Sequence, residues 1–248
     1  KKYLSLVDDD TALLLFNNRG YGIVSKLKHL NPQNPKGYDS EIGGTAHEVF
    51  EDCVDDIEGA VNHAQSRGAK KVYLAGHSTG CQKSVFYTSK TKNKQDISGI
   101  ILICPISDYG HIASHVDKDQ YEKAVAFAKN SVKNKKPHAF LPDELWPDEL
   151  LDAQRFLSLY TPDSSEEIFS YVQPKKDPVT LKSIKAPILV ILAGADEYAE
   201  RPPKKLLEWF DVNNNSTGYK GMVIENALHN LKGVEDKVCD VIKDWISL

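Results

Sequence analysis

Five short apolar runs, rich in Val, Ile and Leu, constrain the fold of this 248-residue chain more than any other feature. Apolar and polar residues do not alternate within the runs, which is typical of strands that are buried on both faces of a parallel sheet. Helical patterns lie between them, so we predict an α/β fold with a mostly parallel sheet flanked by helices. The runs span residues 11–16, 71–75, 99–105, 187–193 and 221–225.

Apolar residues that recur at three- and four-residue steps predict the helices. One stretch, residues 108–185, breaks the alternation because it is helical and charged, holds several prolines and contains no convincing strand. A structureless loop of this length would be unusual. We therefore predict a helical cap of residues 108–185, inserted after the strand that ends near Pro105 into a core of residues 1–107 and 186–248. The predicted core helices cover residues 45–67, 82–89, 203–210 and 234–246.

The charge and the cysteine content exclude several classes of function. A net charge of -4 does not favour nucleic acid or an anionic membrane as a partner. The apolar runs are far shorter than the roughly 20 residues of a membrane helix. Four widely spaced cysteines, with no CxxC pair, predict buried thiols in a reducing, cytoplasmic compartment. We predict neither a metal nor a cofactor, and the sequence does not indicate an oligomeric state.

The pentapeptide of residues 76–80 has the pattern Gly-x-Ser-x-Gly and joins a predicted strand to a predicted helix. So sharp a reversal should hold Ser78 in a strained conformation with its hydroxyl exposed. We expect Gly76 and Gly80 to avoid side-chain collisions across the turn. The helix N-terminus favours negative charge, and the backbone N–H of Thr79 can donate to an oxyanion. Ser78 is therefore the predicted nucleophile.

A serine hydroxyl is a weak nucleophile and needs a base and a group that orients the base. Asp196 and His229 each follow a predicted strand near its carboxyl end. Because open α/β sheets place their sites at that edge, we expect both residues to converge with Ser78. Glu197 and Asp108 are alternatives for the acid. Asp196 is preferred because it lies in a glycine-containing turn directly after a strand.

Other histidines and aromatic residues have structural interpretations. His77 lies beside the nucleophile, so we expect it to pack against or shape the substrate pocket. Most cap aromatics should form a small core, but one or two should face the substrate, and Trp146 is the candidate. His111 and His115 have the i,i+4 spacing of a zinc pair. No Glu accompanies them in an HExxH pattern, which favours a surface cap helix.

These motifs resemble the α/β-hydrolase superfamily along essentially the whole chain. In that fold the triad follows the order Ser, then Asp or Glu, then His, as Ser78, Asp196 and His229 do here. The loop of residues 17–22 looks like the loop after the fold's fourth strand, where an Arg-Gly pair is usual. Further stretches look like a branch that includes fungal siderophore esterases and related bacterial hydrolases. These stretches are residues 43–46, 50–53, 76–82, 105–108 and 157–159.

The resemblance also implies that the N-terminal part of this sequence differs from the superfamily's usual pattern. If residues 11–16 form the fourth strand, the first three strands of the fold are missing from this sequence. The His-Gly-type loop after the third strand, which supplies the second oxyanion N–H, is missing with them. The second oxyanion donor therefore has no candidate, although Thr79 can supply the first.

We predict a serine hydrolase that cleaves carboxylic esters through an acyl-enzyme on Ser78, with a small-molecule ester as its substrate. The same triad would permit acyl transfer to an alcohol or amine. A non-catalytic ligand-binding protein on the same fold is the alternative from another class.

Overall fold

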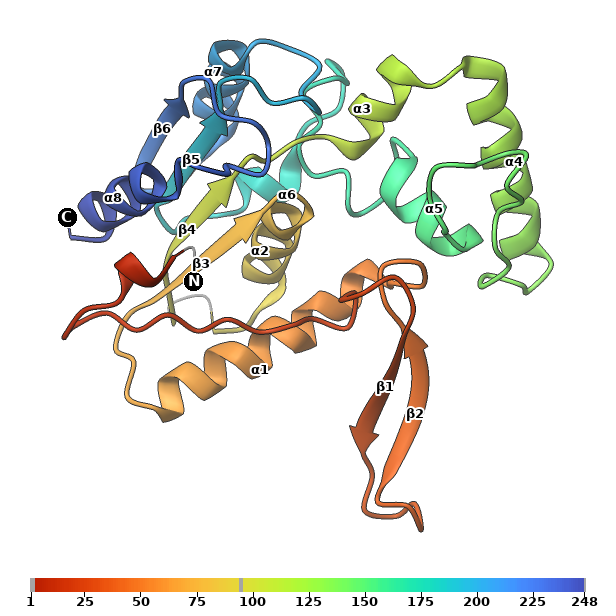
Figure 1. The fold of residues 1–248 in the computed structure, drawn as a ribbon, viewed down its shortest axis with the longest axis horizontal. Coiled ribbons are helices and arrows are strands. Elements are labelled where there is room, and N and C mark those ends of the chain that lie inside the picture. The colour runs from red at the N-terminus through yellow and green to blue at the C-terminus, as the bar shows by residue number, and fades with distance from the viewer. Residues whose placement is uncertain (1–2, 94–95, 248) are drawn as a thin grey trace.

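A four-stranded parallel sheet forms the centre of the structure, a computed structural model that describes residues 3–93 and 96–247. The strands lie in the order β3-β4-β5-β6, with β3 at one edge (Figure 1). They nearly coincide with the last four apolar runs, so the predicted parallel sheet is confirmed. Their bounds are β3 (Val72–His77), β4 (Ile97–Ile103), β5 (Ile188–Ala193) and β6 (Tyr219–Ile224).

Alternate residues of the strands pack against helices on opposite faces of the sheet. In β5, Ile188 and Val190 belong to the buried cluster that includes α1, α2, α6 and α7, whereas Leu189 and Ile191 belong to the cluster with α8. Both faces are thus apolar, which explains the non-alternating sequence. Among the described residues no helix is both long and apolar enough to cross a membrane. The helices are α1 (Cys53–Ser66), α2 (Thr79–Lys90), α6 (Val179–Lys182), α7 (Pro203–Asn213) and α8 (Glu235–Ile246).

A helical insertion between β4 and β5 stands to one side of the sheet and has its own buried cluster (Figure 1). It confirms the predicted insertion after the strand near Pro105. Ile168, Phe169 and Leu181 belong instead to the cluster under the main sheet, so a cap that extends to residue 185 stays a prediction. The helices of the insertion are α3 (Asp108–His115), α4 (Lys118–Lys133) and α5 (Ala153–Tyr160).

The helix predicted from residue 45 begins later, so its predicted start was wrong. A short 3-10 turn, η2 (Phe50–Asp52), leads into α1 at Cys53. The N–H groups of Thr45 and Ala46 donate instead to the carbonyls of Gly22 and Ile23, at 2.7 and 3.0 Å. Because these donors bond to a distant loop, the segment that contains Thr45 and Ala46 is held out of the helix.

The predicted strand at residues 11–16 was also wrong, because this segment is not in any strand. Leu15 is 75% exposed, and the segment follows a short 3-10 turn, η1 (Leu4–Leu6), that packs near α8. The next elements are an unpredicted antiparallel hairpin, β1 (Ser25–Leu30) and β2 (Tyr38–Gly43), which projects from the body (Figure 1). Its mostly exposed strands give no buried apolar run, the signal on which strand prediction depends.

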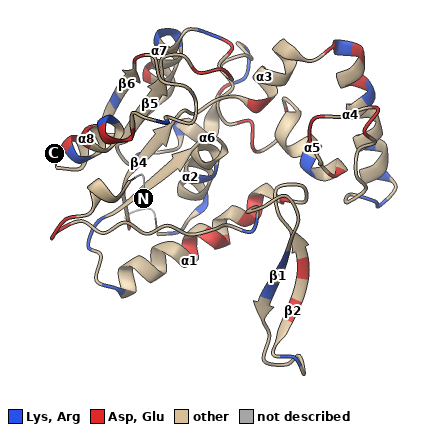
Figure 2. Cartoon of the chain, in the orientation of Figure 1, with Lys and Arg blue, Asp and Glu red and all other residues tan. Residues whose placement is uncertain are grey.

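Acidic residues line part of α1, and some of them anchor the loop before the hairpin (Figure 2). The guanidinium group of Arg19 pairs with Asp52 at 3.1 Å and with Asp56 at 2.9 Å. The Arg19 backbone N–H donates to the same Asp56 carboxylate at 2.9 Å. These contacts fix the loop of residues 17–22 beside the carboxyl end of the sheet, where the candidate site lies.

Candidate active site

The turn of residues 76–80, here called the elbow, holds Ser78 between β3 and α2. Ser78 has φ 55° and ψ −128°, a strained conformation for a residue with a side chain. A Cβ atom on Gly76 would lie 2.2 Å from the carbonyl oxygen of Gly80, so only glycine fits there. A Cβ on Gly80 would meet nothing within 4 Å, so the prediction that a side chain there would collide was wrong. The crossing backbones therefore constrain only the first glycine.

Backbone contacts support the strained serine from both sides. The Ser78 N–H donates to the carbonyl of Ile103 in β4 at 3.0 Å, and the Cys81 N–H donates to the Ser78 carbonyl at 2.8 Å. Thr79 is the first residue of α2, where backbone N–H groups have no acceptor within the helix. Its N–H is therefore available to an oxyanion formed at Ser78.

The structure brings Asp196 and His229 into direct contact. The Asp196 carboxylate lies 2.8 Å (Oδ2) and 3.0 Å (Oδ1) from His229 Nδ1, and both side chains are buried. The Tyr198 N–H donates to Asp196 Oδ1 at 3.0 Å and holds the carboxylate in place. A carboxylate on Nδ1 favours the tautomer that leaves Nε2 able to accept a proton.

The two alternative acids occupy other positions. Glu197 accepts a hydrogen bond from the backbone N–H of His229 at 2.8 Å, so it braces the loop and not the imidazole ring. Asp108 lies at the start of α3 and accepts from Gln82 Nε2 at 2.9 Å. Burial and then the charge of Glu166 raise the Asp108 pKa well above its usual value. Asp196 is thus the carboxylate that the fold pairs with the histidine.

Ser78 and His229 are both among the described residues, and no hydrogen bond joins their side chains. Nucleophile and base commonly close this contact only when substrate binds. His77 lines the cavity beside the elbow, and its Nε2 lies 2.8 Å from the carbonyl oxygen of His229, with the two rings 5.0 Å apart. Desolvation of the ring lowers the His77 pKa. An N–H at Nε2 of His77 can donate to that carbonyl and hold the His229 loop beside the elbow.

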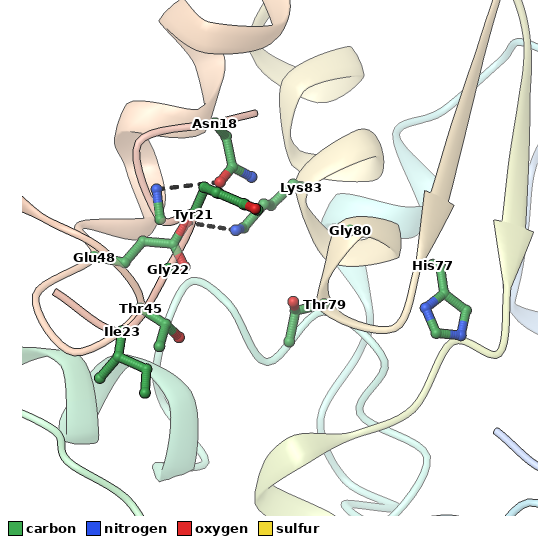
Figure 3. Close-up of a pocket in the computed structure, with 11 residues that line it drawn as sticks. Asn18, Tyr21, Gly22, Ile23, Thr45, Glu48, His77, Thr79, Gly80 and Lys83 are labelled. Carbon is green, nitrogen blue, oxygen red and sulfur yellow. Dashed lines mark hydrogen bonds and ion pairs between the residues drawn. The ribbon is translucent and has the colours of Figure 1, made fainter. Parts of the chain in front are cut away.

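A cavity of about 460 Å³ opens beside the elbow. Thr79, Gly80 and His77 lie on one side, and the loop anchored by Arg19 lies across from them (Figure 3). The cavity size falls within the range of small-molecule sites. The lining residues are Asn18, Gly20, Tyr21, Gly22, Ile23, Thr45, Glu48, His77, Thr79, Gly80 and Lys83.

A buried ionic network under this cavity was not predicted from the sequence. Lys83 Nζ lies 2.5 Å from Glu48 Oε1, and the Arg155 guanidinium bridges Glu48 at 3.2 Å and Glu166 at 2.5 Å. All four side chains are buried. The charges balance as two positive and two negative, which burial requires. The sequence hints at this network through Lys83 alone, which lies on a helix whose other residues are mostly buried. The acidic partner of Lys83 and the other members of the network are far away in the chain.

Trp146, predicted to face the substrate, does not line this cavity. Its side chain is 5% exposed and packs in the cap cluster against Phe156, at a ring distance of 4.9 Å, and Tyr160, at 5.4 Å. The indole thus packs with the other cap aromatics, and contact between Trp146 and the substrate stays a prediction. His111 and His115 lie on α3 as expected, and their rings stack at 4.4 Å.

Among the described residues, two clusters of side chains have the composition of metal sites. The first consists of Cys104, Asp196 and His229, but burial and then the charge of Asp196 raise the Cys104 pKa to about 12, so its thiol is a poor ligand. The second consists of His47, His138 and Asp152 at the junction of the cap and the core. All four cysteines are free and buried, as predicted.

The sheet, its flanking helices and the Ser, Asp, His order define the α/β-hydrolase fold, which the chain shares with many solved structures. Residues 39–247 match the family described as "Protein of unknown function (DUF1749)", and the chain belongs to this family. No curated protein matches the sequence.

Three of the similar structures illustrate the shared fold. Est1E from Butyrivibrio proteoclasticus has 14% identity and a TM-score of 0.52, over 80% of this chain and 70% of that one. The monoacylglycerol lipase of Paleococcus ferrophilus has 16% identity and a TM-score of 0.53, over 84% and 81%. A soluble variant of monoglyceride lipase from Saccharomyces cerevisiae has 19% identity and a TM-score of 0.53, over 79% and 68%. The finer resemblance to siderophore esterases is not confirmed by these matches.

Proposed function

We propose that this protein is a serine hydrolase that cleaves carboxylic esters of small molecules through an acyl-enzyme on Ser78. The observation that carries the proposal is the buried contact between Asp196 and His229 beside a strained serine at a helix N-terminus. Two of the similar structures are named as lipases of monoacylglycerol or monoglyceride, which supports an ester as the substrate class.

The proposed reaction proceeds in two halves. Ser78 Oγ attacks the ester carbonyl carbon while His229 Nε2 accepts the hydroxyl proton, and Asp196 stabilises the imidazolium ion. The Thr79 N–H donates to the oxyanion. His229 then gives its proton to the departing alcohol, which leaves an acyl group on Ser78. Water, deprotonated by His229, then attacks the acyl carbonyl carbon. His229 returns that proton to Ser78 Oγ as the acid departs, which regenerates the free enzyme.

The cavity fits a substrate of modest size. The cavity adjoins the elbow through His77, Thr79 and Gly80, and its volume of about 460 Å³ suits an ester with a short acyl or alcohol group. Two of its lining residues, Glu48 and Lys83, form an ion pair whose charges cancel. A neutral ester is therefore the expected substrate. Acyl transfer remains the second use of the same triad, and adding a competing alcohol or amine acceptor would distinguish the products.

The test is turnover of a panel of p-nitrophenyl esters of increasing chain length. Ser78→Ala should lower the turnover rate by several orders of magnitude, because the nucleophile is lost. Ser89→Ala is the matched control, since Ser89 lies on the same helix and its hydroxyl donates to the Phe86 carbonyl. Glu197→Gln should retain far more activity than Asp196→Asn. Full turnover by the folded Ser78→Ala variant would refute the proposal, whereas a wild type inactive on the whole panel would favour a ligand-binding protein.

A further inference from the structure

Three metal-ligating side chains outside the proposed triad meet where the cap joins the core. His47 comes from the loop before α1, and His138 and Asp152 come from the segment between α4 and α5. Asp152 Oδ2 lies 2.9 Å from His47 Nδ1 and 2.8 Å from His138 Nδ1. The three atoms lie within 4.8 Å of one another, so a single ion could contact all of them.

The charge of Asp152 gives this cluster a reason to hold a cation. The carboxylate is 0% exposed, and its Oδ1 accepts the backbone N–H of Arg155 at 2.8 Å. The Arg155 guanidinium is directed to Glu48 and Glu166, so it does not neutralise Asp152. Asp152 is also the N-cap of α5, whose N-terminus offsets part of its charge, and a bound cation would balance the remainder. Only the two imidazole rings face Oδ2 within the described chain, and neutral rings supply no net charge.

We propose that His47, His138 and Asp152 bind a divalent transition metal, with zinc as the best fit and water as a fourth ligand. Two imidazole nitrogens and one carboxylate oxygen match the ligands of zinc, whereas magnesium and calcium favour oxygen-only sets. Zinc bonds of about 2.1 Å place tetrahedral ligands about 3.4 Å apart, so each nitrogen would withdraw by about 0.5 Å from Oδ2. The side chain of His138 is 61% exposed, which gives the ring room to move and the ion a path from solvent.

The proposed ion would fasten the cap to the wall of the cavity. The Asp152 N–H donates to the Ala46 carbonyl at 2.9 Å, and Gln154 Nε2 donates to the His47 carbonyl at 3.2 Å. His47 stands between Thr45 and Glu48, and both of these residues line the cavity. Metal binding would therefore stiffen that wall without touching the elbow. The inference is independent of ester hydrolysis, because it concerns ligands outside the triad.

The experiment is a calorimetric titration of the metal-free full-length protein with Zn²⁺, followed by metal analysis after dialysis. One zinc per chain is expected. His138→Asn keeps a side chain that can donate to Asp152 but loses the imidazole, and it should weaken zinc binding at least about tenfold. His63→Asn, at an exposed position on α1, is the matched control and should bind zinc as the wild type does.

Two further variants separate the possible outcomes. His47→Asn should weaken zinc binding as His138→Asn does, and the thermal shift on adding Zn²⁺ should be smaller in both folded variants than in the wild type. His229→Gln should leave the titration unchanged, because that histidine belongs to the other cluster. Absence of zinc binding by the wild type, or binding that His229→Gln abolishes and His138→Asn does not, would overturn the proposal.

Discussion

Replacement of Arg155 tests whether the buried ionic network holds the cap on the core. Arg155 is 2% exposed and pairs with Glu166, which is 1% exposed, and with Glu48. In Arg155→Met, Glu48 keeps its contact with Lys83, but the Glu166 carboxylate loses the guanidinium and keeps the Ser158 hydroxyl at 2.9 Å. Removal of one partner from a buried ion pair costs about 3–5 kcal/mol. The free energy of unfolding should fall by that amount, which is a factor of roughly 150–5,000 in the folding equilibrium constant.

Urea denaturation of a double-mutant cycle measures this cost. Glu166→Gln removes the charge but keeps an acceptor for Ser158, so the double variant Arg155→Met/Glu166→Gln should recover part of the stability. Arg67→Met, at an exposed position, is the control and should change stability little. The reasoning fails if Arg155→Met costs less than about 1 kcal/mol, or if the two single effects add without coupling.

Three further changes test other parts of the structure. Gly76→Ala should lower the thermal midpoint, with a cost of at least about 1–3 kcal/mol, because its Cβ collides with backbone, whereas Gly80→Ala should leave the fold intact. Burial raises the Glu167 pKa from 4.5 to about 7, so the folded state holds this proton more tightly than the unfolded state. Stability should therefore fall as the pH rises from 4.5 to 7, and Glu167→Gln should flatten that part of a pH series of denaturation curves. Asp196→Asn should lower kcat by about 10³–10⁴ in steady-state assays, because the amide no longer fixes His229 in the reactive tautomer.

The elbow and the order of the triad residues could be predicted because their signals are local. The pattern around Ser78 depends on one strand, one turn and one helix, and Asp196 and His229 each follow a strand that is recognisable by itself. The wrong prediction of a strand has the same origin, because it also depended on local sequence alone. Residues 11–16 have the composition of a strand, yet a strand also needs a partner, and none pairs with this segment in the structure.

The ionic network and the histidine cluster could not be predicted because they depend on tertiary contacts. His47 and Asp152 are 105 residues apart, and their contact exists only because the cap folds back on the loop before α1. No spacing rule connects residues at such distances. Trp146 shows a further limit of sequence-based prediction. Composition indicates an aromatic residue in the cap, but it does not indicate whether the ring faces the cap core or the substrate.

Labelling of the folded protein with a fluorophosphonate probe, followed by peptide mapping, tests the central claim most directly. The account predicts one adduct per chain, on Ser78, because only an activated serine reacts readily. Labelling should persist in Ser89→Ala and disappear in Ser78→Ala and in urea-unfolded protein. Failure of the folded wild type to react, or an adduct on another serine with Ser78 unmodified, would contradict the assignment of Ser78 as the nucleophile.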